Sequence, residues 1–192
     1  MFLLGLTGSI GMGKSTTARL FAEEGCAVWD ADAAVHRLYA PGGAATRPMA
    51  EAFPDAMEDG GVSRARLKEI IATDRTALKR IEEIVHPLVG ADRAAFIEAA
   101  SADIVVLDIP LLFETGGNTR VDAVVCVLVD EATQRERVLA RGTMTEAQFE
   151  AIRAKQLPAA EKAARSDYVI ETDTIEHARA QVQAVVQDIR ER

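Results

Sequence analysis

The sequence contains little cysteine and no cluster of metal-ligating side chains, which argues against two common kinds of site. Its two cysteines, Cys26 and Cys126, are far apart and adjoin apolar segments, so we expect buried free thiols rather than a disulfide. The three histidines, His36, His86 and His177, are scattered along the chain, and no Cys-x-x-Cys motif occurs. The sequence therefore gives little support to a structural zinc site.

Long apolar runs and an excess of basic charge are missing as well. The longest apolar stretch, residues 123–129, is too short to span a bilayer, and the amino terminus lacks the features of a signal peptide. The net charge is −8, whereas a generic nucleic-acid-binding protein is more often basic. We therefore expect a cytoplasmic protein with neither a membrane nor a nucleic acid as its partner.

The most informative segment is residues 8–15, Gly-Ser-Ile-Gly-Met-Gly-Lys-Ser, which matches the P-loop pattern G-x-x-x-x-G-K-[ST]. In such a loop, backbone N–H groups cradle the phosphates of a nucleoside triphosphate. Lys14 can bridge the β- and γ-phosphates, and the Ser15 hydroxyl can hold Mg²⁺. An apolar run at 2–7 precedes the loop and a helical pattern at 15–24 follows it, which is the context that a true P-loop requires.

The remaining pattern predicts an α/β fold. Five short apolar runs have the length of buried strands: 2–7, 26–29, 104–107, 124–129 and 168–170. Helical segments separate them, which favours a parallel sheet with helices on both faces. Residues 44–100 carry no convincing strand and are typical of a helical insert; 54–61 is predicted to be a loop, and Pro87 is expected to kink or interrupt a long helix.

Carboxylates follow two of the predicted strands. Asp108 comes after four apolar residues, as a Walker B acid does, and could hold Mg²⁺; alternatively it only caps the next segment. Asp30 and Asp32 end another strand, where residues two apart face the same side. We expect Asp32 to accept the proton of an attacking hydroxyl with Asp30 in support, and one of them also to cap the helix at Ala33. Since ligands bind beyond the carboxyl ends of parallel strands, these carboxylates and the P-loop are predicted to converge.

Basic residues gather in the last third of the chain. Residues 131–165 contain seven basic and five acidic side chains, a local excess of positive charge in an acidic protein. Arg137 and Arg141 are four apart and share a helix face, and Gly142 follows as a candidate hinge. We interpret Arg141 as the arginine of a closing lid that meets charge on a transferred phosphoryl group. The alternative is a set of solvated helix faces.

The sequence argues against a GTPase and favours a kinase. P-loop GTPases recognise guanine through an Asn-Lys-x-Asp segment, but the single asparagine here, Asn118, is followed by Thr119. The chain resembles the dephospho-CoA kinase family over nearly its whole length. The segments that carry the resemblance are Gly5–Thr16, Asp30-Ala31-Asp32, Pro41-Gly42-Gly43, His86-Pro87 and Asp108-Ile109-Pro110-Leu111-Leu112-Phe113-Glu114. The last is far more specific than the P-loop. Leu139-Ala140-Arg141 resembles the start of the family's lid, and Gln156 its end.

The resemblance implies the final step of coenzyme A synthesis, in which ATP phosphorylates the ribose 3′-hydroxyl of dephospho-CoA. Lys14 then holds the transferring phosphate, Asp32 is the base and Arg141 the lid arginine, while Ser15 and Asp108 hold Mg²⁺. The implied substrate-binding residues are Asp32, His86 and Asp108. The implied ATP-binding residues are Gly8, Ile10, Gly11, Met12, Gly13, Lys14, Ser15 and Thr16. Taken alone, His86 is more often a structural hydrogen-bonding group than a catalyst.

The resemblance also implies the architecture, a three-layer P-loop NTPase fold that forms a single kinase domain over residues 1–192. Its core covers about 1–32, 101–140 and 166–192; a helical CoA-binding insert covers about 33–100, and an arginine-bearing lid about 141–165. Two positions depart from the family pattern. Gly142 follows Arg141 where the family often has Asp, and Ile170-Glu171-Thr172-Asp173 stands where Asp-Asn is expected, near the adenine of related kinases.

Two other functions remain open at this point. One is another small-molecule or nucleotide kinase of the same fold, which substrate profiling would separate. The other is a non-catalytic P-loop binding module, against which the intact Lys14, Ser15, Asp32 and Asp108 argue.

Overall fold

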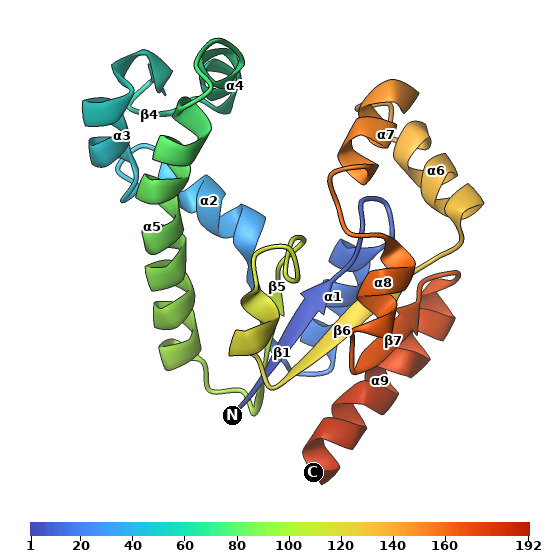
Figure 1. Cartoon of the computed structure of the whole chain (residues 1–192). Coiled ribbons are helices and arrows are strands. Elements are labelled where there is room, and N and C mark those ends of the chain that lie inside the picture. Colours follow the sequence, from blue (N-terminus) through green and yellow to red (C-terminus); the bar gives the residue numbers. More distant parts are fainter. The chain divides into compact units, whose positions relative to one another are not determined.

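The computed structural model describes residues 1–192, which form two compact units. Unit 1 comprises Met1–Trp29 and Ala100–Arg192, and unit 2 comprises Asp30–Ala99. Each unit has its own hydrophobic core. Figure 1 colours the chain along its sequence, so unit 2 appears in the pale blue to green part of the ribbon. None of the helices has the length and apolar character needed to cross a membrane.

A five-stranded sheet forms the centre of unit 1. Its strands are β1 (Phe2–Thr7), β2 (Ala27–Asp30), β5 (Ile104–Asp108), β6 (Ala123–Leu128) and β7 (Tyr168–Glu171). The order is β2-β5-β1-β6-β7, and β1 pairs in parallel with both β5 and β6. β6 and β5 are buried along most or all of their length, which explains their nearly continuous apolar sequences. All five predicted strands are confirmed, with ends shifted by a residue or two.

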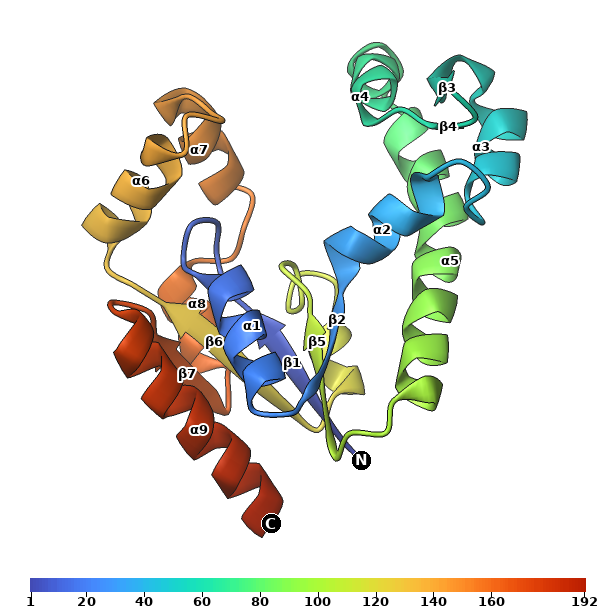
Figure 2. The same ribbon diagram turned by 180° about the vertical axis from the view of Figure 1, so that it is seen from behind.

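Helices cover both faces of this sheet. The helices of unit 1 are α1 (Lys14–Glu23), α6 (Glu131–Ala140), α7 (Glu146–Arg153), α8 (Ala159–Ala164) and α9 (Ile175–Glu191), with a short 3₁₀ turn at Gly117–Arg120. α1 and α9 lie side by side on one face, while α8 packs on β6 from the other (Figures 1 and 2). The core between α1, α9 and the sheet is built from large apolar side chains such as Leu4, Leu20, Phe21 and Val182, each fully buried. The predicted three-layer parallel α/β arrangement is confirmed.

Unit 2 is mostly helical. Its elements are α2 (Ala31–Tyr39), α3 (Thr46–Ala52), a 3₁₀ turn (Pro54–Ala56), β3 (Met57–Glu58), β4 (Gly61–Val62), α4 (Arg64–Thr73) and α5 (Ala77–Ala99). The Ser63 hydroxyl caps α4 by accepting a hydrogen bond from the Arg66 backbone N–H at 3.5 Å. Met49, Ile81 and Val85 belong to the buried cluster that joins α3 and α5.

Two expectations for unit 2 are wrong. Residues 57–62 form an antiparallel hairpin instead of a loop. Its turn residues, Asp59 and Gly60, both adopt positive φ (49° and 79°), as a two-residue hairpin turn requires, but strands of two residues are too short to show alternation in sequence. Pro87 does not interrupt α5. Pro87 and Glu83, one turn earlier, are exposed, so water can satisfy the carbonyl group that loses its N–H partner.

Candidate active site

The P-loop connects the end of β1 to the start of α1. Gly13, with a φ of 85°, is the N-cap of α1, which begins at Lys14. Backbone N–H groups at a helix N-terminus lack partners within the helix, and the helix dipole favours anions there. Ser15 is exposed in this first turn. The local structure therefore matches the phosphate site that the sequence predicts.

Three later segments of unit 1 hold the P-loop backbone from outside. The side-chain amide of Gln134, on α6, donates to the Ile10 carbonyl at 2.7 Å, and Gln134 is only 1% exposed. The Ile10 N–H donates to Gln156 Oε1 at 3.2 Å, and the Thr172 hydroxyl donates to the Met12 carbonyl at 2.8 Å. Thus α6, the segment before α8 and the segment after β7 all contribute to the shape of the loop.

Lys14 and Asp108 form an ion pair at the carboxyl ends of the central strands. Asp108 is the last residue of β5, lies opposite Leu6 of β1 and is 1% exposed. The predicted convergence of the P-loop and this carboxylate is confirmed. Asp108 thus orients the Lys14 ammonium at the start of α1, beside the P-loop.

A cavity of about 920 Å³ opens beside the P-loop, wholly within unit 1. Its walls come from the P-loop, the end of β6, α6, α7 and the segments before α8 and after β7; they include Ser9, Met12, Gln134, Gln156, Leu157 and Asp173. This volume lies within the range of small-molecule and cofactor pockets. The cavity adjoins the phosphate loop, which is the arrangement that a nucleotide needs.

Arg137 holds one residue of this wall, Asp173, although no role of its own was predicted for it. Its guanidinium donates to the Thr172 hydroxyl at 3.2 Å, to the Thr172 carbonyl at 2.7 Å and to the Asp173 carbonyl at 3.3 Å. Thr172 therefore connects α6 to the P-loop in the place where Asn was expected. The only sequence signal for Arg137 was its helical spacing to Arg141.

Arg141 lies at the C-terminal end of α6 as its C-cap and is exposed. It pairs with no acidic side chain, in contrast to Arg135 of the same helix, which pairs with Glu146. Gly142 follows with a φ of 64°, so the chain turns there without steric cost. Arg141 is thus available to a ligand in this structure.

The other predicted site residues belong to unit 2. Asp30 is the N-cap of α2, and its carboxylate accepts the Ala33 backbone N–H at 2.9 Å. Asp32 is already in the first helical turn, so the expectation that the two carboxylates share a strand face is wrong: capping by Asp30 ends the strand. Asp32 is exposed, as is His86 on α5. The structure thus assigns Asp32 and His86 to one unit, and Lys14, Ser15, Asp108 and Arg141 to the other.

Two sets of side chains in unit 1 could bind a metal ion. Ser15 and Asp108 offer a hydroxyl and a carboxylate, the hard oxygen donors that suit Mg²⁺. Glu171, Asp173 and His177 form a second group whose ligand atoms lie within 4.8 Å of one another. All three are exposed, and the His177 ring already pairs with Asp173 at 2.7 Å. The Thr174 backbone N–H and His177 lower the pKa of Asp173, so this cluster is explained without a metal.

Comparison with known proteins gives a consistent result. Residues 2–177 match the family model described as dephospho-CoA kinase. A dephospho-CoA kinase of Ruegeria pomeroyi is 69% identical, over 98% of this chain and 96% of the relative. One of Cereibacter sphaeroides is 61% identical, over 99% and 96%. A crystal structure of TT1252 from Thermus thermophilus superposes with a TM-score of 0.87 at 30% identity, covering 97% of this chain and 96% of that one.

Gly11 offers a test of how tightly the P-loop is packed. Gly11 has a φ of 79°, and a Cβ there would collide with Val138 Cγ2 and lie 3.1 Å from the Gln134 carbonyl oxygen. We expect Gly11→Ala to weaken ATP binding at least about tenfold and to destabilise the fold by about 2 kcal/mol. Isothermal titration calorimetry and thermal unfolding measure the two effects.

Gly116→Ala is the matched control, because Gly116 also has positive φ (70°) but no atom within 4 Å of an added Cβ. It should destabilise by about 1 kcal/mol or less and leave ATP affinity unchanged. Equal losses of ATP affinity in both variants would contradict the idea that close packing shapes the loop.

Proposed function

This chain belongs to the dephospho-CoA kinase family, and we propose that Lys14, Asp32 and Arg141 carry out its phosphoryl transfer. The enzyme transfers a phosphoryl group from ATP to the ribose 3′-hydroxyl of dephospho-CoA, giving coenzyme A and ADP, the last step of coenzyme A biosynthesis. The single observation that carries the residue assignment is the P-loop lysine paired with the Asp108 carboxylate at the strand ends.

ATP binds in unit 1 in this proposal. The backbone N–H groups of the P-loop hold the phosphates, and the cavity beside it accepts the rest of the nucleotide; the cavity volume and the loop geometry support this. The ATP-binding residues are Gly8, Ile10, Gly11, Met12, Gly13, Lys14, Ser15 and Thr16. Arg137 and Thr172, which are hydrogen-bonded to each other next to Asp173 of the cavity wall, take the place of the Asp-Asn segment expected near the adenine.

Lys14 and Arg141 supply positive charge to the phosphoryl group as it is transferred. The transition state of phosphoryl transfer spreads negative charge over the equatorial oxygens, so fixed cations lower its free energy more than that of the bound substrate. Lys14 is held close to the phosphate site by Asp108. Arg141 has no acidic partner to give up, which suits a cation that joins the site when a lid closes.

Asp32 and His86 act on the acceptor in this proposal. Asp32 accepts the proton of the ribose 3′-hydroxyl as that oxygen attacks phosphorus, for which an exposed carboxylate in the first turn of α2 is suited. His86 binds substrate from α5, and Asp108 contributes to both substrate and metal binding. Residues of about 33–100 form the insert that binds the CoA moiety, and about 141–165 form the lid.

Mg²⁺ is the proposed metal cofactor, with Ser15 and Asp108 as the residues that would hold it. Such an ion would supply positive charge that offsets the negative charge of the ATP phosphates. We also propose a cytoplasmic location, because Cys26 and Cys126 are free thiols, and these persist in a reducing compartment. Burial raises the pKa of each thiol to about 11, so both are unreactive at neutral pH.

Product analysis tests the proposed reaction directly. Mass spectrometry after incubation with ATP, Mg²⁺ and dephospho-CoA should detect coenzyme A and ADP in equal amounts. Lys14→Ala should retain the fold and lose at least about 10²-fold in rate, since one preorganised cation is removed from the transferring phosphate. Turnover of other alcohols or nucleotides in place of dephospho-CoA would instead support a different small-molecule kinase.

The role of Asp32 predicts a specific kinetic defect. Asp32→Asn preserves shape but removes the proton acceptor, so kcat should fall by about 10² or more while the KM for ATP changes little. Steady-state kinetics with each substrate varied in turn measures both constants. Asp55→Asn, an exposed carboxylate of the same unit, serves as the control and should behave as wild type. A variant whose only defect is weaker ATP binding would move Asp32 from the acceptor site to the nucleotide site.

The proposed lid predicts ligand-dependent protection from hydrogen exchange. Residues 142–155 of the lid should exchange rapidly in the free protein and slowly when ATP and a dephospho-CoA analogue bind together. Arg141→Ala should lower kcat by at least about tenfold without changing the melting temperature, whereas Lys155→Ala, also exposed and unpaired in this segment, should do neither. Unchanged exchange with both ligands bound, together with a normal kcat in Arg141→Ala, would remove the lid from the mechanism.

A further inference from the structure

Unit 1 contains one fully buried ammonium group. The side chain of Lys162, on α8, is 0% exposed, and its Nζ lies 2.9 Å from Glu114 Oε1. Lys162 also donates to the Pro110 carbonyl at 3.1 Å. A buried ammonium is costly unless a carboxylate and further hydrogen bonds compensate it. Lys162 is therefore retained in the interior by Glu114 and Pro110, which lie on the loop that follows β5.

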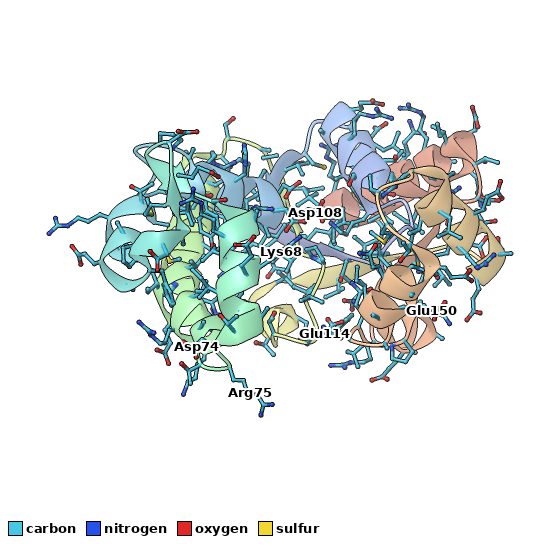
Figure 3. The ribbon with its side chains drawn as sticks, turned by 90° about the horizontal axis from the view of Figure 1, so that it is seen from above. Lys68, Asp74, Arg75, Asp108, Glu114 and Glu150 are labelled. Atoms are coloured by element: carbon cyan, nitrogen blue, oxygen red, sulfur yellow. The ribbon has the colours of Figure 1, made fainter.

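Glu114 makes a second contact with the same oxygen. Glu114 Oε1 accepts the backbone N–H of Leu157 at 3.0 Å, and Leu157 packs against the buried pair Leu112 and Phe113. Burial alone would raise the pKa of Glu114, but the hydrogen bonds from Lys162 and the Leu157 N–H lower it below its usual value. Glu114 is thus a carboxylate at neutral pH, and it joins the loop after β5 (Figure 3) to the segment between α7 and α8.

These contacts continue to the P-loop. Gln156, next to Leu157, accepts the Ile10 N–H of the P-loop at 3.2 Å. Gln156 and Leu157 both line the nucleotide cavity. Pro110, the other partner of Lys162, also accepts the hydroxyl of Thr7, the last residue before the P-loop, at 3.1 Å. Lys162 and Glu114 therefore reach the phosphate loop by two routes, although neither lines the cavity.

We propose that Glu114 is a positioning residue for ATP: together with Lys162 it fixes the lid segment at Leu157, so that Gln156 and Leu157 form the nucleotide wall beside the P-loop. This inference rests on the proposed ATP site in unit 1. Neither Glu114 nor Lys162 touches the nucleotide, and both act through Leu157, Gln156 and Pro110. The lid then bends at Gly142 and is anchored in its second half by a buried ion pair.

A purely structural ion pair would give a different kinetic result from a positioning pair. If the pair only stabilised the fold, its loss would reduce the fraction of active enzyme and leave the KM of the remaining enzyme unchanged for both substrates. If it positions the nucleotide wall, the KM for ATP rises in the folded enzyme. The KM for dephospho-CoA then stays constant, because the proposed CoA-binding insert does not include this pair.

The decisive experiment measures both KM values and the ATP Kd for Glu114→Gln well below its melting temperature. We expect the KM and Kd for ATP to rise at least about fivefold, with the KM for dephospho-CoA within twofold of wild type. Glu161→Gln on α8 is the control, because it breaks an exposed pair with Arg165 and should change neither constant. If Glu114→Gln does not fold, Glu114→Asp takes its place: it keeps the charge but is too short to reach both Lys162 and Leu157.

Two further variants, Lys162→Met and the double variant Glu114→Gln/Lys162→Met, complete a double-mutant cycle for this ion pair. Lys162→Met should raise the KM for ATP, and the double variant should be no worse than the poorer single variant, because both act on one connection. An unchanged KM for ATP in a folded Glu114 variant, equal rises for both substrates, or fully multiplicative effects would each overturn the proposal. Normal coenzyme A formation by the wild-type enzyme keeps the proposed function separate from this outcome.

Discussion

The close approach of other segments to the P-loop backbone is the constraint on which the rest of unit 1 depends. A side chain at Gly8 would collide with Val127 of β6, and one at Gly13 would lie 3.0 Å from the Thr172 hydroxyl. Glycine is therefore required by packing as well as by the phosphates that the loop receives. Because these glycines have no side chain, three segments can contact the loop directly: β6, α6 and the segment after β7. These contacts fix the shape of the loop. A loop that is already shaped loses less entropy when it binds nucleotide.

Each buried or partly buried ammonium group of unit 1 is paired with a carboxylate. The Lys14 ammonium loses part of its hydration at the strand ends, and the Asp108 carboxylate compensates that loss by pairing with it. Because the pair lies at the carboxyl ends of the central strands, the lysine is oriented by a rigid element rather than by a mobile loop. Lys162 shows the same physical rule farther from the phosphates, where Glu114 compensates a buried cation that has no direct part in binding.

The sequence was most informative where one local pattern determines the structure. Five apolar runs became strands, and the glycine-lysine-serine pattern became the loop before α1, because these features depend on short-range geometry and burial. The hairpin at 57–62 was not predicted because its strands are only two residues long. The continuity of α5 through Pro87 depends on the solvent exposure of the helix, which a single sequence does not reveal. Gln134 and Lys162 were missed for a third reason: each acts on a partner more than 50 residues away in sequence, so only the fold brings them together. Arg137, likewise, had only its spacing to indicate a role.

The central position of β1 has a consequence for how the chain is made. Of the five strands of this sheet, β1 is synthesised first, and it pairs on one side with β5, where Phe2 lies opposite Ile104, and on the other with β6. No part of its hydrogen-bonding ladder can form until unit 2 has been synthesised. At ~5–20 residues per second, the apolar segment 2–7 waits on the order of 5–20 s for its first partner. Unit 2, which is contiguous in sequence, can bury its own core during that interval. Residues 2–7 thus remain an unpaired apolar segment throughout that interval.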